Sequence, residues 1–353
     1  MTIPRSMKAA ILVEQKKPLV IDNVELPSSL DVGQVLVKVH YSGICGSQLG
    51  EIDGVKGEDK FLPHLLGHEA SATVLEIGPG VRHVKPQDRV VLHWRKGAGI
   101  ECAPPTYSWQ GKKLNAGWIA TFNEYAIVAE NRMTAIPTDS DLDIAALFGC
   151  AITTGFGVIE NNAHVRIGES VVVFGAGGVG LNIVQAAALV GAHPVIAVDL
   201  YDNRLSLARE MGATHQINAS KVDAKTAIES ITGLGGLDVF VDNTGQPAII
   251  EMGLGLTKPQ GRVTLVGVPR KGNNIQIYSL PLHFGKGLSG SHGGESIPHM
   301  DIPRYHALFR AKKIKLKELI TEYVSLDNIN TAIGNMRSGT TAGRCMVKMD
   351  DWS

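Results

Sequence analysis

A glycine-rich turn, Gly175-Ala176-Gly177-Gly178-Val179-Gly180, separates a short apolar run from a longer apolar stretch. The run at 171–174 is typical of a buried strand, the stretch at 179–190 of a helix, and 195–199 of a second strand. Strand, helix and strand in this order form a βαβ unit, which requires a parallel sheet with crossover helices. From about residue 170 we therefore expect a doubly wound α/β domain.

The same glycines can hold the phosphates of a dinucleotide. Gly175, Gly177 and Gly180 give the G-x-G-x-x-G spacing at a strand end and a helix start, where backbone N–H groups attract an anion. Asp199 follows at about the 20-residue offset at which a carboxylate can accept hydrogen bonds from ribose hydroxyls. It would repel a 2′-phosphate, which favours NAD over NADP, although Arg204 nearby weakens that preference. The alternative is a glycine-rich turn without a ligand.

The first part of the chain has a different pattern, with short β-rich segments between Gly, Pro and Asp turns. This pattern predicts a mainly antiparallel, barrel-like module, and 353 residues suit two domains. The C-terminal stretch predicts helices at 304–310 and 329–336 and a strand at 344–348, which could complete either domain. The strands predicted in the first module are 8–13, 34–39, 71–77 and 89–92.

Three soft metal ligands occur in order along the chain: Cys45, His68 and Cys150. Taken singly, a buried Cys is usually a small apolar residue and a His a satisfied core residue. Together, thiolate and imidazole select zinc, and three protein ligands leave one position open for a water or a substrate oxygen. Ser47 and Glu69 flank these ligands in glycine-containing loops, so we expect a catalytic rather than a structural zinc.

In the order and spacing of these motifs the chain resembles the zinc-dependent medium-chain alcohol dehydrogenases over nearly its full length. The motifs are 67–69 followed by 78–81, the Cys45 and Cys150 loops, and 175–180 with Asp199. The resemblance implies a GroES-like catalytic domain and a Rossmann NAD-binding domain. Their expected boundaries are 1–150 and 293–353 for the GroES-like domain, which is split in sequence, and 151–292 for the Rossmann domain.

The resemblance also implies roles for single residues. Cys45, His68 and Cys150 would bind the catalytic zinc, and Glu69 would lie beside it as an indirect or transient ligand. Ser47 would hydrogen-bond the substrate hydroxyl and start a proton relay. The residues expected at the nucleotide are Thr154, Gly175, Gly177, Gly178, Val179, Gly180, Asp199, Arg204, Val268 and Arg344.

The chain departs from the resemblance in one lobe. Many relatives hold a second, structural zinc with four cysteines, but the matching region, 93–118, contains only Cys102, so we expect one zinc per subunit. This lobe is basic and aromatic. One interpretation is that aromatic packing replaces the metal. The other is that Trp94 contacts the substrate while Arg95 or Lys96 recognises an anionic or polyhydroxy group.

A second departure lies beside the first ligand. Gln48 stands where relatives commonly have an aspartate that orients the zinc-binding histidine. A neutral amide can still accept the N–H of the His68 ring, although it attracts that proton less strongly. We therefore expect Gln48 to accept a hydrogen bond from His68.

The composition of the chain restricts the classes of partner that we expect it to bind. The 34 Lys+Arg and 34 Asp+Glu residues give a net charge of +0, which argues against nucleic acid or an anionic membrane as a partner. No apolar stretch reaches the length of a signal peptide or a membrane span. Four scattered cysteines fit reduced thiols, so we expect a cytoplasmic protein acting on a small molecule, as a homodimer or homotetramer.

We therefore predict an NAD-dependent zinc alcohol dehydrogenase for a small alcohol, a polyol or a sugar-derived substrate. One alternative is a zinc-free quinone or enoyl reductase of the same superfamily, against which all three zinc ligands argue. Another is a non-catalytic nucleotide-binding redox sensor. In such a protein Ser47 and Thr154 would have no reason to occur beside the ligands.

Overall fold

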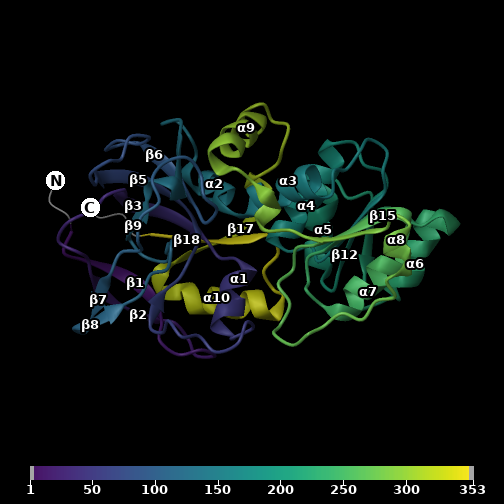
Figure 1. Ribbon diagram of the computed structural model, residues 1–353, viewed down its shortest axis with the longest axis horizontal. Coiled ribbons are helices and arrows are strands. Elements are labelled where there is room, and N and C mark those ends of the chain that lie inside the picture. Colours follow the sequence, from purple (N-terminus) through teal and green to yellow (C-terminus); the bar gives the residue numbers. More distant parts are fainter. Residues whose placement is uncertain (1–3, 350–353) are drawn as a thin grey trace. The chain divides into compact units, whose positions relative to one another are not determined.

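The computed structural model describes residues 4–349, and these divide into two compact units (Figure 1). Unit 1 contains the chain up to Cys150, Ile297–Ala307 and the chain from Ile320 onward. Unit 2 contains Ala151–Ser296 and Leu308–Leu319.

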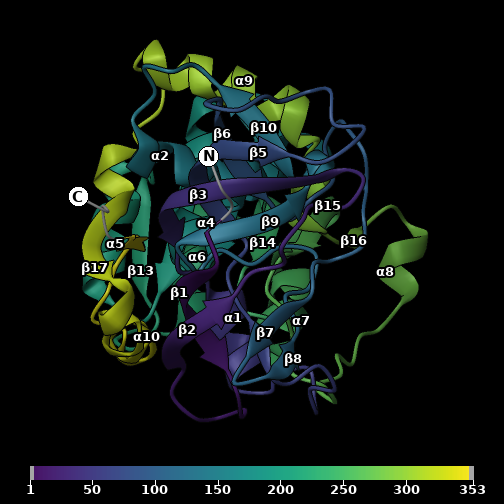
Figure 2. The same ribbon diagram turned by 90° about the vertical axis from the view of Figure 1, so that its left-hand side faces the viewer.

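Unit 1 is built from two mainly antiparallel sheets. The larger one has seven strands in the order β10-β6-β5-β3-β18-β17, with β9 also paired to β3, and the smaller has the order β4-β1-β2-β7-β8. Figure 2 labels β3, β5, β6, β9 and β10 of the larger sheet and β1, β2, β7 and β8 of the smaller one. The strands of unit 1 are β1 (Ser6–Leu12), β2 (Val20–Glu25), β3 (Gln34–Gly43), β4 (His64–Leu65), β5 (Glu69–Ile77), β6 (Arg89–His93), β7 (Tyr107–Trp109), β8 (Lys112–Leu114), β9 (Tyr125–Ala129), β10 (Met133–Ile136), β17 (Ile320–Ser325) and β18 (Arg344–Lys348). Its helices include α1 (Gly46–Ile52), the short η1 (Glu130–Arg132), α2 (Leu142–Ala146), η2 (Leu147–Gly149) and α10 (Ile329–Ser338).

Strand β3 lies between two apolar cores. Val35, Val37 and Val39 belong to one buried cluster, and Leu36 belongs to the other. This division follows from the period of two in a strand, which directs successive side chains to opposite faces. The loop that leaves β3 at Gly43 therefore starts from a strand whose last two residues are buried.

The C-terminal strand completes the sheet of unit 1. In β18, Met346 pairs with Gly43 and Lys348 with Tyr41, antiparallel to β3. Cys345 and Val347 are buried in the same core as the β3 valines, which explains why this segment joins unit 1. The pairing brings Arg344 beside the loop that follows Gly43.

Unit 2 is a six-stranded, wholly parallel sheet in the order β13-β12-β11-β14-β15-β16. This is the strand order of a doubly wound Rossmann fold, and it confirms the predicted fold class. The strands are β11 (Val171–Phe174), β12 (Val195–Asp199), β13 (His215–Asn218), β14 (Leu237–Asp242), β15 (Thr257–Leu265) and β16 (Gly287–Gly290). The α-helices are α3 (Ala151–Gly157), α4 (Gly178–Leu189), α5 (Asp202–Glu210), α6 (Ala224–Thr232), α7 (Pro247–Leu256) and α8 (Leu280–His283), and α9 (Pro298–Arg310) runs from unit 1 into the last segment of unit 2.

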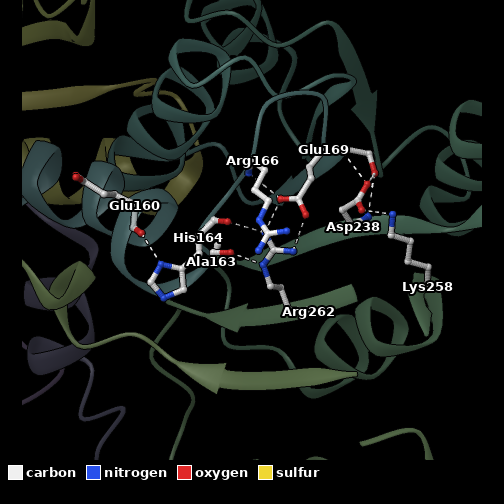
Figure 3. Close-up of polar contacts among 9 residues, drawn as sticks. Glu160, Ala163, His164, Arg166, Glu169, Asp238, Lys258 and Arg262 are labelled. Carbon is white, nitrogen blue, oxygen red and sulfur yellow. Dashed lines mark hydrogen bonds and ion pairs between the residues drawn. The ribbon is translucent and has the colours of Figure 1, made fainter. Parts of the chain in front are cut away.

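A polar cluster fixes the start of the central strand β11 (Figure 3). Arg262 on β15 donates to both carboxylate oxygens of Glu169, at 3.0 and 2.6 Å, and to the carbonyl of His164 at 3.1 Å. Asp238 accepts from the backbone N–H and the hydroxyl of Ser170, at 3.0 and 2.9 Å, and pairs with Lys258. These bonds hold one end of β11 and thereby position the glycine turn at its other end.

The second half of the chain divides differently from the expected boundary at 292/293. The segment 308–319 groups with unit 2, where the Gln185 side chain accepts from the N–H of Lys315 at 2.5 Å and donates to its carbonyl at 3.2 Å. No helix of the described residues is by itself long and apolar enough to cross a membrane, and one bent pair, Leu142–Gly149 with Ala151–Asn162, meets that criterion by length and composition only.

Candidate metal centre and nucleotide site

The three predicted metal ligands come together in unit 1. Cys45 caps the N-terminus of α1, His68 immediately precedes β5, and Cys150 follows η2. One ligand atom of each lies within 4.8 Å of the others. Residues 105 positions apart in the chain thus present two thiols and an imidazole to one point, which is the donor set that zinc prefers.

The two thiols are not equivalent without a metal. A hydrogen bond with Cys150 lowers the pKa of Cys45 well below its usual range, and Arg344 lowers it further. The same hydrogen bond, with burial, raises the pKa of Cys150. One thiolate and one thiol therefore share a proton, and a divalent cation would displace it because zinc binds the thiolate form.

His68 directs its Nε2 atom toward this centre. Its Nδ1 atom contacts the side-chain amide of Gln48, which is only 1% exposed. Nε2 is buried and has no hydrogen-bond partner among residues 4–349. A buried nitrogen of this kind normally has a partner, and a metal ion between the thiols would supply it.

A buried ion pair lies next to the ligands. Glu69 is 0% exposed and its Oε1 lies 3.3 Å from Nη1 of Arg344, which also donates to the Ile44 carbonyl at 2.9 Å. Burial lowers the pKa of Arg344, but Glu69 and the two cysteines raise it more, so it stays charged. With both thiols deprotonated, three negative charges and one positive charge leave two negative charges, which match a divalent cation.

Glycines enclose the carboxylate of that pair. A Cβ atom on Gly43 would lie 2.5 Å from Oε1 of Glu69, and one on Gly149 would lie 2.8 Å from its Cβ. Neither position can carry a side chain without moving Glu69. The sequence indicated glycine-flanked loops here, but it did not show that they confine Glu69.

Ser47 lies in the first turn of α1, two residues after Cys45. The described part of the chain offers its buried Oγ no hydrogen-bond partner. A hydroxyl can both donate and accept, so this atom is available to a substrate hydroxyl. The structure thus places Cys45, His68, Cys150, Glu69, Ser47 and also Arg344 in unit 1.

The glycine turn of unit 2 has the shape of a phosphate cradle. Gly175 has a φ of +98°, which favours glycine. A Cβ on Gly180 would lie 1.9 Å from the Gly175 carbonyl oxygen, so only glycine fits there. A Cβ on Gly177 would meet nothing within 4 Å. That space, with Gly178 and Val179 opening helix α4, suits a pyrophosphate at a helix N-terminus.

Asp199, the last residue of β12, lies beside the glycine turn. Its Oδ2 accepts from the N–H of Ala176 in the turn at 2.7 Å, and its Oδ1 accepts from the N–H of Leu200 at 2.8 Å. Arg204 lies 3.8 Å from Oδ1 and its guanidinium stands over the Tyr201 ring at 4.8 Å. The Asp199 carboxylate is therefore hydrogen-bonded to the glycine turn itself, and its expected role at the ribose stays a prediction.

Two other residues expected at the nucleotide, Thr154 and Val268, also belong to unit 2 and lie outside the glycine turn. Thr154 is buried in α3, which packs against α4. Val268 is 51% exposed in the loop after β15, where it packs against Gly245. Arg344 lies in unit 1, as described above, and its partners there are Glu69 and Ile44.

Comparisons with known proteins identify the family. Residues 31–138 match the model for the alcohol dehydrogenase GroES-like domain, and residues 178–311 match that for zinc-binding dehydrogenases. The chain is 30% identical to alcohol dehydrogenase class-3 of Cereibacter sphaeroides, over 96% of this chain and 99% of that protein. The chain belongs to the zinc-dependent medium-chain alcohol dehydrogenase family.

Further relatives of this family share the sequence and the fold. The S-(hydroxymethyl)glutathione dehydrogenase of Paracoccus denitrificans is 29% identical over 94% of this chain and 97% of that protein. The crystal structure of benzyl alcohol dehydrogenase from Acinetobacter calcoaceticus matches with a TM-score of 0.88 at 29% identity, over 98% of this chain and 100% of that chain. The protein is thus a zinc-dependent oxidoreductase that transfers hydride between an alcohol or carbonyl substrate and NAD(H).

A polar network that the sequence did not predict holds one loop of the lobe that lacks the four cysteines. This loop, residues 94–101, is called the lobe loop. Oε1 of Glu130, a side chain 1% exposed, accepts from the N–H groups of Arg82 and His83, both at 2.6 Å, and Oε2 from that of Ile100 at 2.8 Å. Burial raises the pKa of Glu130, but these N–H groups lower it more, so it stays charged.

Arg132, two residues further on, holds the other end of the same loop. It donates to the Trp94 carbonyl and to both oxygens of Glu101, at 3.3 and 3.2 Å, and Glu101 also pairs with Lys96 at 2.6 Å. The Trp118 ring lies over the Arg132 guanidinium at 5.5 Å but is 54% exposed. Charged hydrogen bonds therefore order the first part of the lobe, and Tyr107 and Trp109 further along it pack in an apolar core.

Proposed function

We propose that Cys45, His68 and Cys150 hold one catalytic zinc per chain, and that unit 2 binds NAD in preference to NADP. The main support for the zinc site is that the thiols of Cys45 and Cys150 and the imidazole of His68, whose buried Nε2 has no partner among residues 4–349, place their ligand atoms within 4.8 Å of one another. The cysteine count supports a single zinc, because Cys102 and Cys345 are the remaining cysteines of the chain.

Zinc bound there would act as a Lewis acid that polarises the hydroxyl or carbonyl of the substrate. The chain supplies the rest of the chemistry. Ser47 Oγ, two residues from Cys45, would accept a hydrogen bond from the substrate hydroxyl and would start a proton relay, releasing its own proton as it takes up that of the substrate. Arg344 would keep Glu69 ionised and occupied, so that this carboxylate balances charge at the centre.

The preference for NAD rests on Asp199. Its two oxygens hold the turn and the following backbone, so the carboxylate is fixed where a ribose would bind. A phosphate on the 2′ position would meet this charge and cost affinity. Arg204 is directed toward Asp199 and Tyr201, which leaves it less available to a phosphate.

For the substrate we propose a small neutral alcohol or polyol, including a sugar-derived one, with Trp94 at the binding site. Lys96 is already paired with Glu101, and Arg95 lies beside the Trp94 ring, 5.9 Å from its centroid. The two cations of the loop thus have contacts of their own. This arrangement favours a neutral substrate over the anionic one that the basic sequence also suggested.

Assembly as a homodimer or homotetramer in the cytoplasm completes the proposal. Strand β16 is an edge strand, and the exposed aromatic residues Tyr278 and Phe284 precede it, which suits self-association. The four cysteines are free, and a site with two thiolate ligands suits a reducing compartment.

The test is a panel of benzyl alcohol, a polyol and S-(hydroxymethyl)glutathione, monitored by reduced cofactor with NAD and with NADP. We expect neutral alcohols and NAD to give the highest kcat/KM. Asp199→Asn should lower the preference for NAD roughly 10- to 150-fold, since one unpaired or lost hydrogen bond to a charged group is worth about 1.5–3 kcal/mol. Equal kcat/KM for both cofactors in the wild type would contradict the proposal.

A further inference from the structure

The Gln48 side chain bridges two of the three metal ligands. Its Oε1 accepts from the backbone N–H of Cys45 at 2.8 Å, and its Nε2 faces Nδ1 of His68. A backbone N–H can only donate, so the amide oxygen must face Cys45. The amide orientation is thereby fixed, and it differs from the expectation that Gln48 accepts from His68.

This orientation selects one tautomer of His68. An amide NH2 group only donates, so Nδ1 must accept, and the single proton of a neutral imidazole then lies on Nε2. Nε2 is the buried atom that faces the thiols. In the metal-free protein, the nitrogen that should bind zinc therefore carries a proton.

Zinc needs the opposite tautomer. A metal on Nε2 moves the ring proton to Nδ1, where a carboxylate or carbonyl oxygen usually accepts it. Here the Nδ1 proton would face the NH2 group of Gln48. Turning the amide over would place its oxygen on His68, but its NH2 would then face the N–H of Cys45. With either orientation two donors meet, and the amide is in direct contact with the His68 ring while Gln48 is only 1% exposed.

We propose that Gln48 is a positioning residue that weakens zinc binding, because its amide stabilises the His68 tautomer that cannot take the metal. The inference rests on the proposed zinc site at Cys45, His68 and Cys150. A glutamate at position 48 has acceptors on both oxygens, so it would hold the Cys45 N–H and the Nδ1 proton together. The chain thus exchanges its zinc more readily than it would with that one change.

The tautomer can be observed directly. In the full-length protein with zinc removed by a chelator, ¹³C and ¹⁵N chemical shifts of labelled histidine should show the proton of His68 on Nε2. In Gln48→Glu it should lie on Nδ1. A wild-type protein with the proton on Nδ1 would overturn the inference, even if no variant folds.

Zinc affinity gives the second measurement, by competition with a chromophoric chelator. Gln48→Glu should bind zinc roughly 10- to 100-fold more tightly than the wild type, the range by which such partners change metal affinity. Gln48→Met is the matched control, since it is similar in length and can neither donate nor accept at His68. We expect it to bind zinc at least as tightly as the wild type. Weaker binding by Gln48→Met would mean that glutamate acts through charge alone, and the inference would be wrong.

The failure of this inference can be told from failure of the zinc site itself. Cys45→Ser is measured in the same competition. If it keeps wild-type affinity, zinc does not bind at this centre and the proposed function fails. If it loses zinc while Gln48→Glu matches the wild type, the site stands and only the role of Gln48 is wrong.

Discussion

Two buried polar regions of unit 1 differ in how completely their groups are paired. At the metal centre, Nε2 of His68 and Oγ of Ser47 are buried without hydrogen-bond partners in the described chain. In the lobe loop, both oxygens of Glu130 are used by backbone N–H groups, and Arg132 holds a carbonyl and a carboxylate, although its Nε has no partner in the described chain.

The difference separates a site whose buried groups a ligand could complete from one that the chain's own groups largely complete. Unpartnered buried groups cost stability unless a ligand completes them. A charged side chain that accepts hydrogen bonds from several backbone N–H groups can instead order a loop by itself, as Glu130 does. The buried groups of Glu130 are thus satisfied by the chain itself, whereas those of the proposed metal centre leave atoms that a metal and a substrate could complete.

The largest expected effect comes from removing a ligand at the first region. Cys45→Ser should lower zinc affinity more than 100-fold, because loss of an indirect partner already costs roughly 10- to 100-fold, and alcohol oxidation should be lost with the metal. Cys102→Ser in the lobe should keep one zinc per chain and wild-type activity. Zinc content, measured by inductively coupled plasma mass spectrometry, and steady-state kinetics check both variants. Loss of zinc in Cys102→Ser would contradict the proposal that zinc binds only at the first region.

The local features of both regions could be predicted from sequence, and the long-range ones could not. The turn at 175–180 is predictable because spacing alone dictates its conformation, as the φ of Gly175 and the carbonyl above Gly180 show. The three ligands lie in separate loops, and the resemblance to a family was needed to join them. Arg344 reaches Glu69 only because β18 pairs with β3, a register that periodicity does not encode.

The same limit applies to the polar contacts. Gln48 was expected to accept from His68, but the helix start gives its oxygen to Cys45, only three residues away. Glu130 and Arg132 carry no motif, because their partners lie 30 to 48 residues distant in the chain. Burial of a charged side chain within a strand-rich segment is a tertiary property, which the sequence pattern did not reveal.

The second prediction concerns His93, where the lobe loop begins. Its ring bonds to the Arg95 carbonyl at 2.7 Å and to the Thr134 hydroxyl at 2.9 Å. Burial lowers its pKa from 6.5 to about 4, and the charges of Arg132 and His299 act in the same direction. Between pH 6.5 and about pH 4 the His93 ring is therefore protonated in the unfolded chain but neutral in the folded chain. Stability present above pH 6.5 should be lost as the pH falls, by about 3 kcal/mol at most.

Denaturant unfolding from pH 7 to pH 4 measures this loss. His93→Gln keeps donor and acceptor atoms but cannot titrate, so its free energy of unfolding should fall less steeply than that of the wild type. Zinc release in acid affects both proteins alike, and the difference between their slopes isolates His93. Parallel slopes would show that the start of the loop is not held by a neutral histidine.

The smallest expected effect tests the hydrogen bonds of Glu130 in the lobe that lacks the four cysteines. Glu130→Gln replaces one acceptor oxygen by an NH2 group, which must then face a backbone N–H of Arg82, His83 or Ile100. The free energy of unfolding should fall by about 2 kcal/mol, the value of a hydrogen bond to a charged group, and the melting temperature by roughly 4–8 °C. Glu25→Gln, on the exposed face of β2, is the matched control and should change neither. Zinc content should stay at one per chain in both variants, because the carboxylate orders the loop without contacting a ligand of the metal. A Glu130→Gln protein that is as stable as the wild type but loses zinc would reverse the comparison, since it would tie the lobe to the metal centre instead of to its own hydrogen bonds.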